Sequence, residues 1–199
     1  MASVTGDSVC LILDRLKDSL GIKNQMLTSD CVGQAAEVAA QLVTSLRAGG
    51  KVLFFGNGGS SMDAGHLAAE LAGRFYRDRP PLAGISLSDG TASLTAIAND
   101  YAYDEVFARQ VRGLGRPGDV AVGLTTSGNS VNVLNALLAA REAGLVTVAL
   151  TGSSGGKVAD TADFCLRVPT DDTPRVQEAC MHLGHSICEI VEREMFPER

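Results

Sequence analysis

The chain has 199 residues, of which 45% are hydrophobic and 20% are charged, and this composition is typical of one globular domain with a sizeable core. The formal net charge is −6 and the lysines and arginines form no run, so we do not expect the protein to bind nucleic acid. The sequence also lacks an apolar stretch of about 18 residues, which argues against a membrane span.

The cysteines and the first residues bear on the compartment. The chain has five cysteines, an odd number without paired spacing, and no Cys-x-x-Cys motif of a structural zinc site occurs. Residues 1–10 show neither a basic region nor a cleavage pattern, so we predict no secretory leader. Buried, reduced thiols in a cytoplasmic protein are therefore expected.

The N-terminal quarter of the chain has a helical pattern. Val38, Leu42 and Leu46 recur at every fourth position among polar and small residues, as on the apolar face of a helix. An earlier set of leucines repeats this spacing. A break at Gly21 or around residues 29–30 is expected to divide the segment into two helices.

Beyond this segment, short apolar runs alternate with helical patterns. The predicted strands are residues 51–55, 82–87, 119–124, 146–150 and 164–168. The predicted helices are residues 60–75, 91–98, 103–112, 130–143, about 157–161 and about 172–195. Short, continuously apolar strands are typical of a sheet that is buried on both faces. The alternation predicts an α/β three-layer sandwich, a parallel five-stranded sheet flanked by helices.

We expect this architecture to form one domain over residues 1–199. The helical segment would occupy residues 1–48. The α/β core, closed by the long C-terminal helix, would occupy residues 49–199.

A glycine-rich loop at residues 56–61, Gly-Asn-Gly-Gly-Ser-Ser, follows the first predicted strand and leads into a helix. Such a corner presents free N–H groups at the positive end of a helix dipole, which suits a phosphate or a sugar hydroxyl. A dinucleotide fingerprint would require a third glycine at Ser61, so a nucleotide cofactor is disfavoured. A tight structural turn is the remaining alternative.

A second loop after a predicted strand is rich in hydroxyl groups. Thr125, Thr126 and Ser127 precede Gly128, which permits a close approach to the backbone. Ser130 stands where a helix N-cap is expected. Because capping explains Ser130 but not the other hydroxyls, a phosphate cradle is the better interpretation.

The helix after the glycine loop carries a polar stripe. His66, Glu70 and Arg74 follow one another at intervals of four residues, so they share one face of a helix. A solvated, salt-bridged face is the simplest explanation. The stripe begins within two turns of the glycine loop, however, which favours acid–base or metal chemistry beside a phosphosugar.

The last predicted helix carries two of the three histidines in the chain. Gln177 and His185 lie about two turns apart. Glu178 and His182 form an i, i+4 pair, and His185 and Glu189 form another. The spacing does not choose between these sets, and an exposed polar face is a further alternative.

Taken together, the motifs resemble those of the sugar isomerase (SIS) domain family over nearly the whole chain. Seven motifs occur in the family's order: Gly56-Asn57-Gly58-Gly59-Ser60, His66-x-x-x-Glu70-Leu71, Ala98-Asn99-Asp100-Tyr101, Arg116-Pro117-Gly118-Asp119, Thr126-Ser127-Gly128-Asn129-Ser130, Leu150-Thr151-Gly152 and Arg175-Val176-Gln177-Glu178. Within the family, the resemblance is to the members that isomerise heptose phosphates. It implies the SIS fold, N-terminal helices that help to build a homotetramer, and pockets between subunits.

The resemblance also implies an activity and a site. The reaction would convert D-sedoheptulose 7-phosphate into D-glycero-D-manno-heptose 7-phosphate through an enediol, the first step of nucleotide-activated heptose biosynthesis. Glu70 would act as the base and His185 as the partnering acid. One divalent ion, commonly Zn²⁺, would be bound by His66, Glu70, Gln177 and His185. Phosphosugar contacts are implied for Asn57, Gly58, Gly59, Ser60, Glu70, Arg74, Asn99, Asp100, Thr125, Thr126, Ser127, Ser130 and Gln177.

Two positions depart from the family pattern. Thr125 replaces a residue that is usually serine, and its methyl group would crowd the phosphate. Cys180 replaces a residue that is usually histidine and would be a soft neighbour for the metal. A noncatalytic SIS scaffold, similar to the replication-initiator-associated relatives, is the alternative function. That alternative is disfavoured because such relatives lack parts of the acid–base and metal set, which is complete here.

Overall fold

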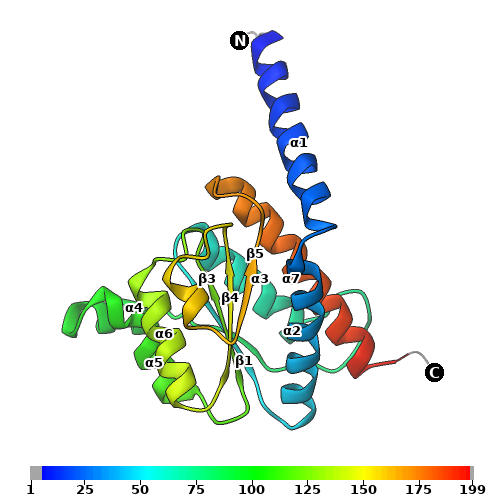
Figure 1. The fold of residues 1–199 in the computed structure, drawn as a ribbon. Helices are drawn as coiled ribbons and strands as arrows, with labels where there is room; N and C mark the ends of the chain where they lie inside the picture. Colours follow the sequence, from blue (N-terminus) through cyan, green and yellow to red (C-terminus); the bar gives the residue numbers. More distant parts are fainter. Residues whose placement is uncertain (1–5, 198–199) are drawn as a thin grey trace, which may run out of the picture.

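A computed structural model describes residues 6–197; residues 1–5, which belong to the segment considered for a leader, lie outside it. The chain forms a five-stranded, fully parallel sheet (Figure 1). The strands are β1 (Val52–Gly56), β2 (Gly84–Ser86), β3 (Val120–Leu124), β4 (Val146–Thr151) and β5 (Phe164–Arg167). The predicted α/β class and the five predicted strands are confirmed.

The strand order places the first strand at a turning point of the sheet. The order is β2-β1-β3-β4-β5, so the chain moves from β1 to one side and then returns to pair β3 on the other side. The loops that follow β1 and β3 therefore leave the same edge of the sheet in different directions. In open α/β sheets, ligands bind in the crevice at such a point.

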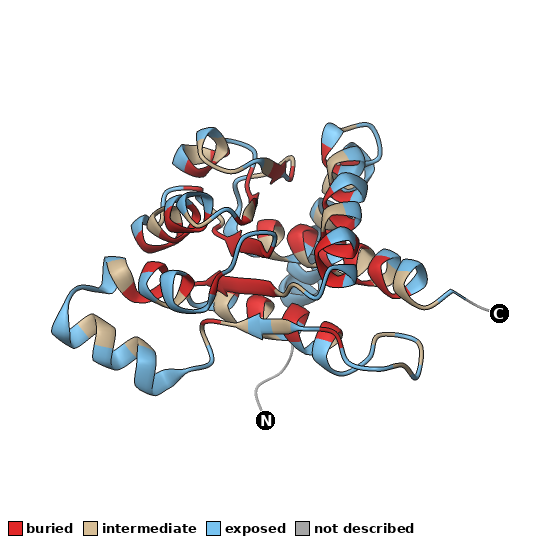
Figure 2. Ribbon diagram, turned by 90° about the horizontal axis from the view of Figure 1, so that it is seen from below, coloured by how far each residue is buried: buried red, intermediate tan, exposed pale blue. Residues whose placement is uncertain are grey.

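Helices cover both faces of the sheet, as predicted for three layers. One core joins the sheet to α2 (Asp30–Arg47), α3 (Gly59–Ala72) and α7 (Thr173–Met195). The other core joins it to α5 (Val106–Leu114) and α6 (Val131–Glu142). Successive strand residues contribute to opposite cores because side chains alternate across a strand. Figure 2 shows buried residues along the strands and the inner faces of these helices.

Two further helices have little or nothing buried. The helix α1 (Gly6–Met26) projects away from the body of the molecule (Figure 1), and of its residues only Met26 is buried. No residue of α4 (Thr91–Asp100) is fully buried. The break between the first two helices lies at residues 27–29, whereas Gly21 is inside α1. None of the described helices combines the length and hydropathy needed to cross a membrane.

Three predicted helices differ in extent or type. α3 ends at Ala72 rather than at residue 75, so Arg74 lies in the following loop. The helix predicted from residue 103 begins as a 3₁₀ helix, η1 (Tyr103–Glu105), before α5. The short helix near residue 157 is also a 3₁₀ helix, η2 (Gly156–Asp160). The division into a helical segment and an α/β core within one domain stays a prediction.

Candidate active site

The glycine loop begins at the end of β1 and is held by side chains from two other elements. The amides of Asn57 and Asn132 exchange hydrogen bonds of 2.8 and 2.9 Å, and the Tyr103 hydroxyl donates to Asn57 Oδ1 at 2.9 Å. Asn132 is buried in the first turn of α6. Asn57 is therefore oriented from both sides. The sequence interpretation missed Asn132 and Tyr103, because no local spacing connects them with the loop.

The glycine loop also makes room for the last helix. A Cβ atom at Gly59 would lie 2.3 Å from Gln177 Nε2, so the Gln177 amide packs directly against this residue. Gln177, on α7, lines a small polar hollow together with Ser60 and Thr125. Predicted phosphosugar residues from two loops and one helix thus line the same hollow.

The hydroxyl loop starts at the end of β3. Thr125 is buried, and its Oγ1 lies 3.0 Å from Ser130 Oγ. Ser130 occupies the N-cap position of α6 but makes no side-chain capping hydrogen bond, so the expected capping role is wrong. Its hydroxyl is turned toward Thr125 instead. Gly128 has a φ of +68°, and a Cβ atom there would lie 2.1 Å from the Gly155 carbonyl oxygen, which requires glycine.

Two histidines and a glutamate converge beside these loops. His66 and Glu70 are on α3, and His66 Nε2 lies 2.9 Å from Glu70 Oε1. His185 reaches in from α7, with its Nε2 atom 3.4 Å from His66 Nε2. One potential ligand atom from each residue lies within 4.8 Å of the others. Of the predicted metal residues, the structure thus brings these three together.

The donor set fits a divalent cation. His66 Nε2 lies 2.9 Å from Glu70 Oε1 and 3.4 Å from His185 Nε2, so a proton on a histidine nitrogen or a cation is needed between these atoms. Two imidazoles and a carboxylate are ligands typical of zinc. Gln177, the predicted fourth ligand, approaches from the same helix as His185. A role for Gln177 as a ligand stays a prediction.

A carboxylate that the sequence interpretation missed lies near this cluster. Asp63 precedes His66 by one turn of α3 and lines the same hollow as Gln177. Burial raises the pKa of Asp63, and the nearby His66 and His185 oppose that shift. The sequence could have indicated Asp63, because its i, i+3 spacing places it on the same face of the helix as His66. Cys180 lines the hollow as well, and burial raises the pKa of its thiol to about 12; a role beside the metal stays a prediction.

The competing residues on α7 face other partners. Glu178 pairs with Arg175 at 2.8 Å, and Glu189 pairs with Arg193. His182 is exposed and lines a groove beside α1. The open question of the last helix is therefore answered for His185, which joins the cluster with His66.

Three predicted contact residues are exposed to solvent. Arg74 is exposed in the loop after α3, because that helix ends before it. Asn99 and Asp100 are exposed at the end of α4, where the Asn99 amide donates to Asp100 Oδ1 at 2.8 Å. Their contacts with a phosphosugar stay predictions.

Comparisons with known proteins show what the whole chain is similar to. Residues 25–152 match the family model of the SIS domain. The phosphoheptose isomerase of Rhodospirillum rubrum is 54% identical over 163 residues, which cover 82% of this chain and 87% of that protein. The phosphoheptose isomerase of Roseiflexus is 46% identical over 187 residues, which cover 94% of each protein. The structure of phosphoheptose isomerase GmhA from Neisseria gonorrhoeae has a TM-score of 0.86 and 41% identity, covering 91% of this chain and 96% of that one.

A parallel sheet with polar loops at its turning point and these matches define the class: the chain belongs to the SIS domain family. Its similarity to several relatives extends over most of both sequences, at 54% and 46% identity in the two cases above. Within that family, the chain is a member of the phosphoheptose isomerases.

Proposed function

We propose that the protein interconverts D-sedoheptulose 7-phosphate and D-glycero-D-manno-heptose 7-phosphate, the first step toward nucleotide-activated heptose. The observation that carries this proposal is the convergence of Glu70, His66 and His185 beside two loops suited to a phosphosugar. Membership of the phosphoheptose isomerases makes the chain an aldose–ketose isomerase and supports this substrate. A noncatalytic scaffold is not favoured.

The reaction moves a proton between adjacent carbons. In our assignment, the hydroxyl loop and the N–H groups at the start of α3 bind the sugar phosphate. The Glu70 carboxylate takes a proton from C1 of the ketose while His185 gives a proton to the C2 carbonyl oxygen, which forms the enediol. Glu70 then returns its proton to C2, and His185 takes the proton of the C1 hydroxyl. Because Glu70 Oε1 faces His66, we assign the C1 proton to Oε2.

Zinc is the ion that we propose for the cluster. His66, Glu70, Gln177 and His185 would hold it, one ion per pocket. When bound, a zinc ion polarises the two sugar oxygens and favours the enediol. The two imidazoles and the carboxylate within 4.8 Å of one another support this choice.

We further propose that the protein works in the cytoplasm as a homotetramer with pockets between subunits. A groove of about 680 Å³ runs between α1 and α7, and His185 lines it together with Leu11, Ile12 and Leu16 of α1. A groove with exposed apolar side chains on its α1 wall that reaches a predicted catalytic residue is expected to be covered in the assembled enzyme. The exposed apolar side chains of α1 support the same conclusion.

The test is turnover of sedoheptulose 7-phosphate by the purified protein. The enzyme would be stripped with a chelator, reloaded with Zn²⁺, and followed for the aldose product. Turnover that depends on the metal is the expected result. Phosphosugar binding without turnover in the metal-loaded protein would favour the scaffold.

A further inference from the structure

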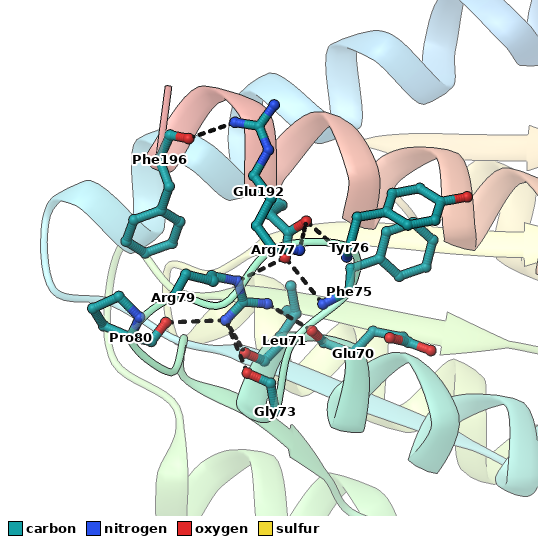
Figure 3. A network of polar contacts seen from close by, with 10 residues as sticks. All are labelled: Glu70, Leu71, Gly73, Phe75, Tyr76, Arg77, Arg79, Pro80, Glu192 and Phe196. Carbon is teal, nitrogen blue, oxygen red and sulfur yellow. Dashed lines mark hydrogen bonds and ion pairs between the residues drawn. The ribbon is translucent and has the colours of Figure 1, made fainter. Parts of the chain in front are cut away.

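A buried ion pair joins α7 to the loop that follows α3. The side chains of Arg79 and Glu192 are each 2% exposed, and Arg79 Nε lies 3.0 Å from Glu192 Oε1. The Glu192 carboxylate also accepts the backbone N–H groups of three consecutive loop residues at 2.8 to 3.0 Å, as Figure 3 shows; these are Phe75, Tyr76 and Arg77. Burial acts to raise the pKa of Glu192, but these hydrogen bonds outweigh it and lower that pKa, so the carboxylate is charged.

The Arg79 guanidinium closes the C-terminal end of α3. It donates to the carbonyl oxygens of Glu70 at 2.7 Å and Leu71 at 2.8 Å, and to that of Gly73 at 3.3 Å. The last carbonyls of a helix have no partner within the helix, and a cation there is favourable. Arg79 therefore binds the last turn of α3 and satisfies its terminal carbonyls.

Both ends of this network reach the candidate active site. Arg79 holds the main chain of Glu70, the proposed base. On the other side, Glu192 holds the backbone of Phe75, whose ring packs against the His185 ring with centroids 5.8 Å apart. Glu192 also lies two turns beyond His185 on α7. The network thus binds the main chain of one proposed catalytic residue, Glu70, directly (Figure 3), and it reaches the other, His185, through the Phe75 ring.

We propose that the Arg79–Glu192 pair is a positioning element of the catalytic site. It holds α3 and α7 at the separation at which Glu70 and His66 from one helix meet His185 from the other. A buried ion pair is seldom more stabilising than well-packed apolar residues, so a geometric role explains it better than stability does. The effect on turnover rests on the proposed isomerase function; the effect on the geometry does not.

Each variant in the experiment removes one set of contacts of the network at a time. Arg79→Lys keeps the charge but loses the fork that reaches the α3 carbonyls. Glu192→Gln keeps the shape but loses acceptors for the loop N–H groups. Phe75→Leu leaves the ion pair intact and removes the ring that contacts both His185 and Tyr76. Arg193→Gln is the control, because it breaks the exposed Arg193–Glu189 pair on the same helix.

The first readout needs neither metal nor substrate. The chain has three histidines, so imidazole NMR signals of the metal-free protein can be assigned, with His182 as an internal reference. We expect the ring signals of His66 and His185 to shift in the variants while that of His182 stays in place. Zinc affinity should fall about 10- to 100-fold, as for other residues that orient metal ligands. The value of kcat should fall more than KM rises, because the phosphate-binding loops are untouched.

Each outcome decides the proposal. If the melting temperature falls in the Arg79 and Glu192 variants while histidine signals and zinc affinity match the control, the pair is only structural and the proposal is wrong. Should one of the two buried variants fail to fold, the other decides it by the same two readouts, because each weakens the ion pair from a different side. A wild-type protein without turnover would contradict the proposed function, yet the NMR comparison would still test the positioning role.

Discussion

At the scale of single residues, Glu70 combines two properties. Its carboxylate faces His66 at 2.9 Å, and its backbone carbonyl is held by Arg79. The side chain is therefore presented from a helix end that cannot easily shift. A general base needs such a fixed position within hydrogen-bond reach of the proton that it removes.

We predict that Glu70→Gln abolishes proton abstraction but keeps substrate binding. The amide retains the shape and one oxygen but not the base, so kcat should fall about 10²- to 10⁴-fold. The assay is exchange of the substrate C1 proton with D₂O, together with metal content measured on the same sample. Exchange at the wild-type rate would make Glu70 a metal ligand only, and Asp100, or Asp63 from the structure, the next candidate for the base.

Ser130→Ala is predicted to weaken phosphosugar binding with little loss of stability. A lost hydrogen bond to a charged group costs about 1.5–3 kcal/mol, which corresponds to roughly a 10- to 150-fold loss of affinity. Because Ser130 makes no capping hydrogen bond, the expected fall in melting temperature is limited to the loss of its 3.0 Å contact with the buried Thr125 hydroxyl. Thr44→Ala, which removes an exposed hydroxyl within α2, is the control. An unchanged KM in Ser130→Ala would remove this residue from the phosphate site.

At the scale of elements, the site depends on how closely the glycine loop approaches α7. We predict that Gly59→Ala lowers kcat/KM by about 10²-fold, the cost of misplacing a catalytic group by about 1 Å. The added Cβ would lie 2.3 Å from Gln177 Nε2, so the flexible amide must move. The fold should survive, because the Gln177 side chain can yield while the backbone stays.

Gly33→Ala is the matched control for this substitution. Gly33 lies in α2, and a Cβ atom there meets nothing within 4 Å. It should be neutral or stabilise by about 0.4–1 kcal/mol, because alanine restricts the unfolded chain. Calorimetry and kinetics on both variants separate the two effects. Equal kcat/KM values for both variants would show that Gln177 tolerates displacement.

The elements were largely predictable, because strands buried on both faces produce apolar runs that stand out in a sequence. The ends were not. α3 stops before Arg74 because Arg79 binds its last carbonyls, a contact that no spacing indicates. The spacing of His66 and Glu70 pointed to them, but His185 was chosen through a family resemblance, since periodicity alone left His182 equally plausible. Asn132 and Glu192 were missed because they act on residues 75 or more positions away in the chain.

At the scale of the whole molecule, the fold of a single chain does not explain the exposed apolar side chains of α1. Val9, Leu11, Ile12, Leu13, Leu16 and Leu20 are between 49% and 62% exposed on a helix that leaves the body of the molecule. A soluble protein rarely exposes such a surface in its assembled state. The proposed tetramer would bury it.

We therefore predict that Leu16→Glu dissociates the assembly and lowers turnover. A charge in the groove between α1 and α7 opposes the burial of its apolar lining, and His185 lies in that groove. Sedimentation velocity of the variant should show smaller species than the wild type. Lys17→Gln, at an exposed neighbouring position, is the control. A monomeric wild type with full activity would refute the tetramer.

The distance along the chain between the converging side chains has a consequence for biosynthesis. His66 and His185 are 119 residues apart, and the helix that carries His185 follows every strand of the sheet. The chain emerges from the ribosome N-terminus first. All five strands are therefore synthesised before His185, the second imidazole of the cluster. Metal capture by the full set of ligands must wait until the last helix has left the exit tunnel.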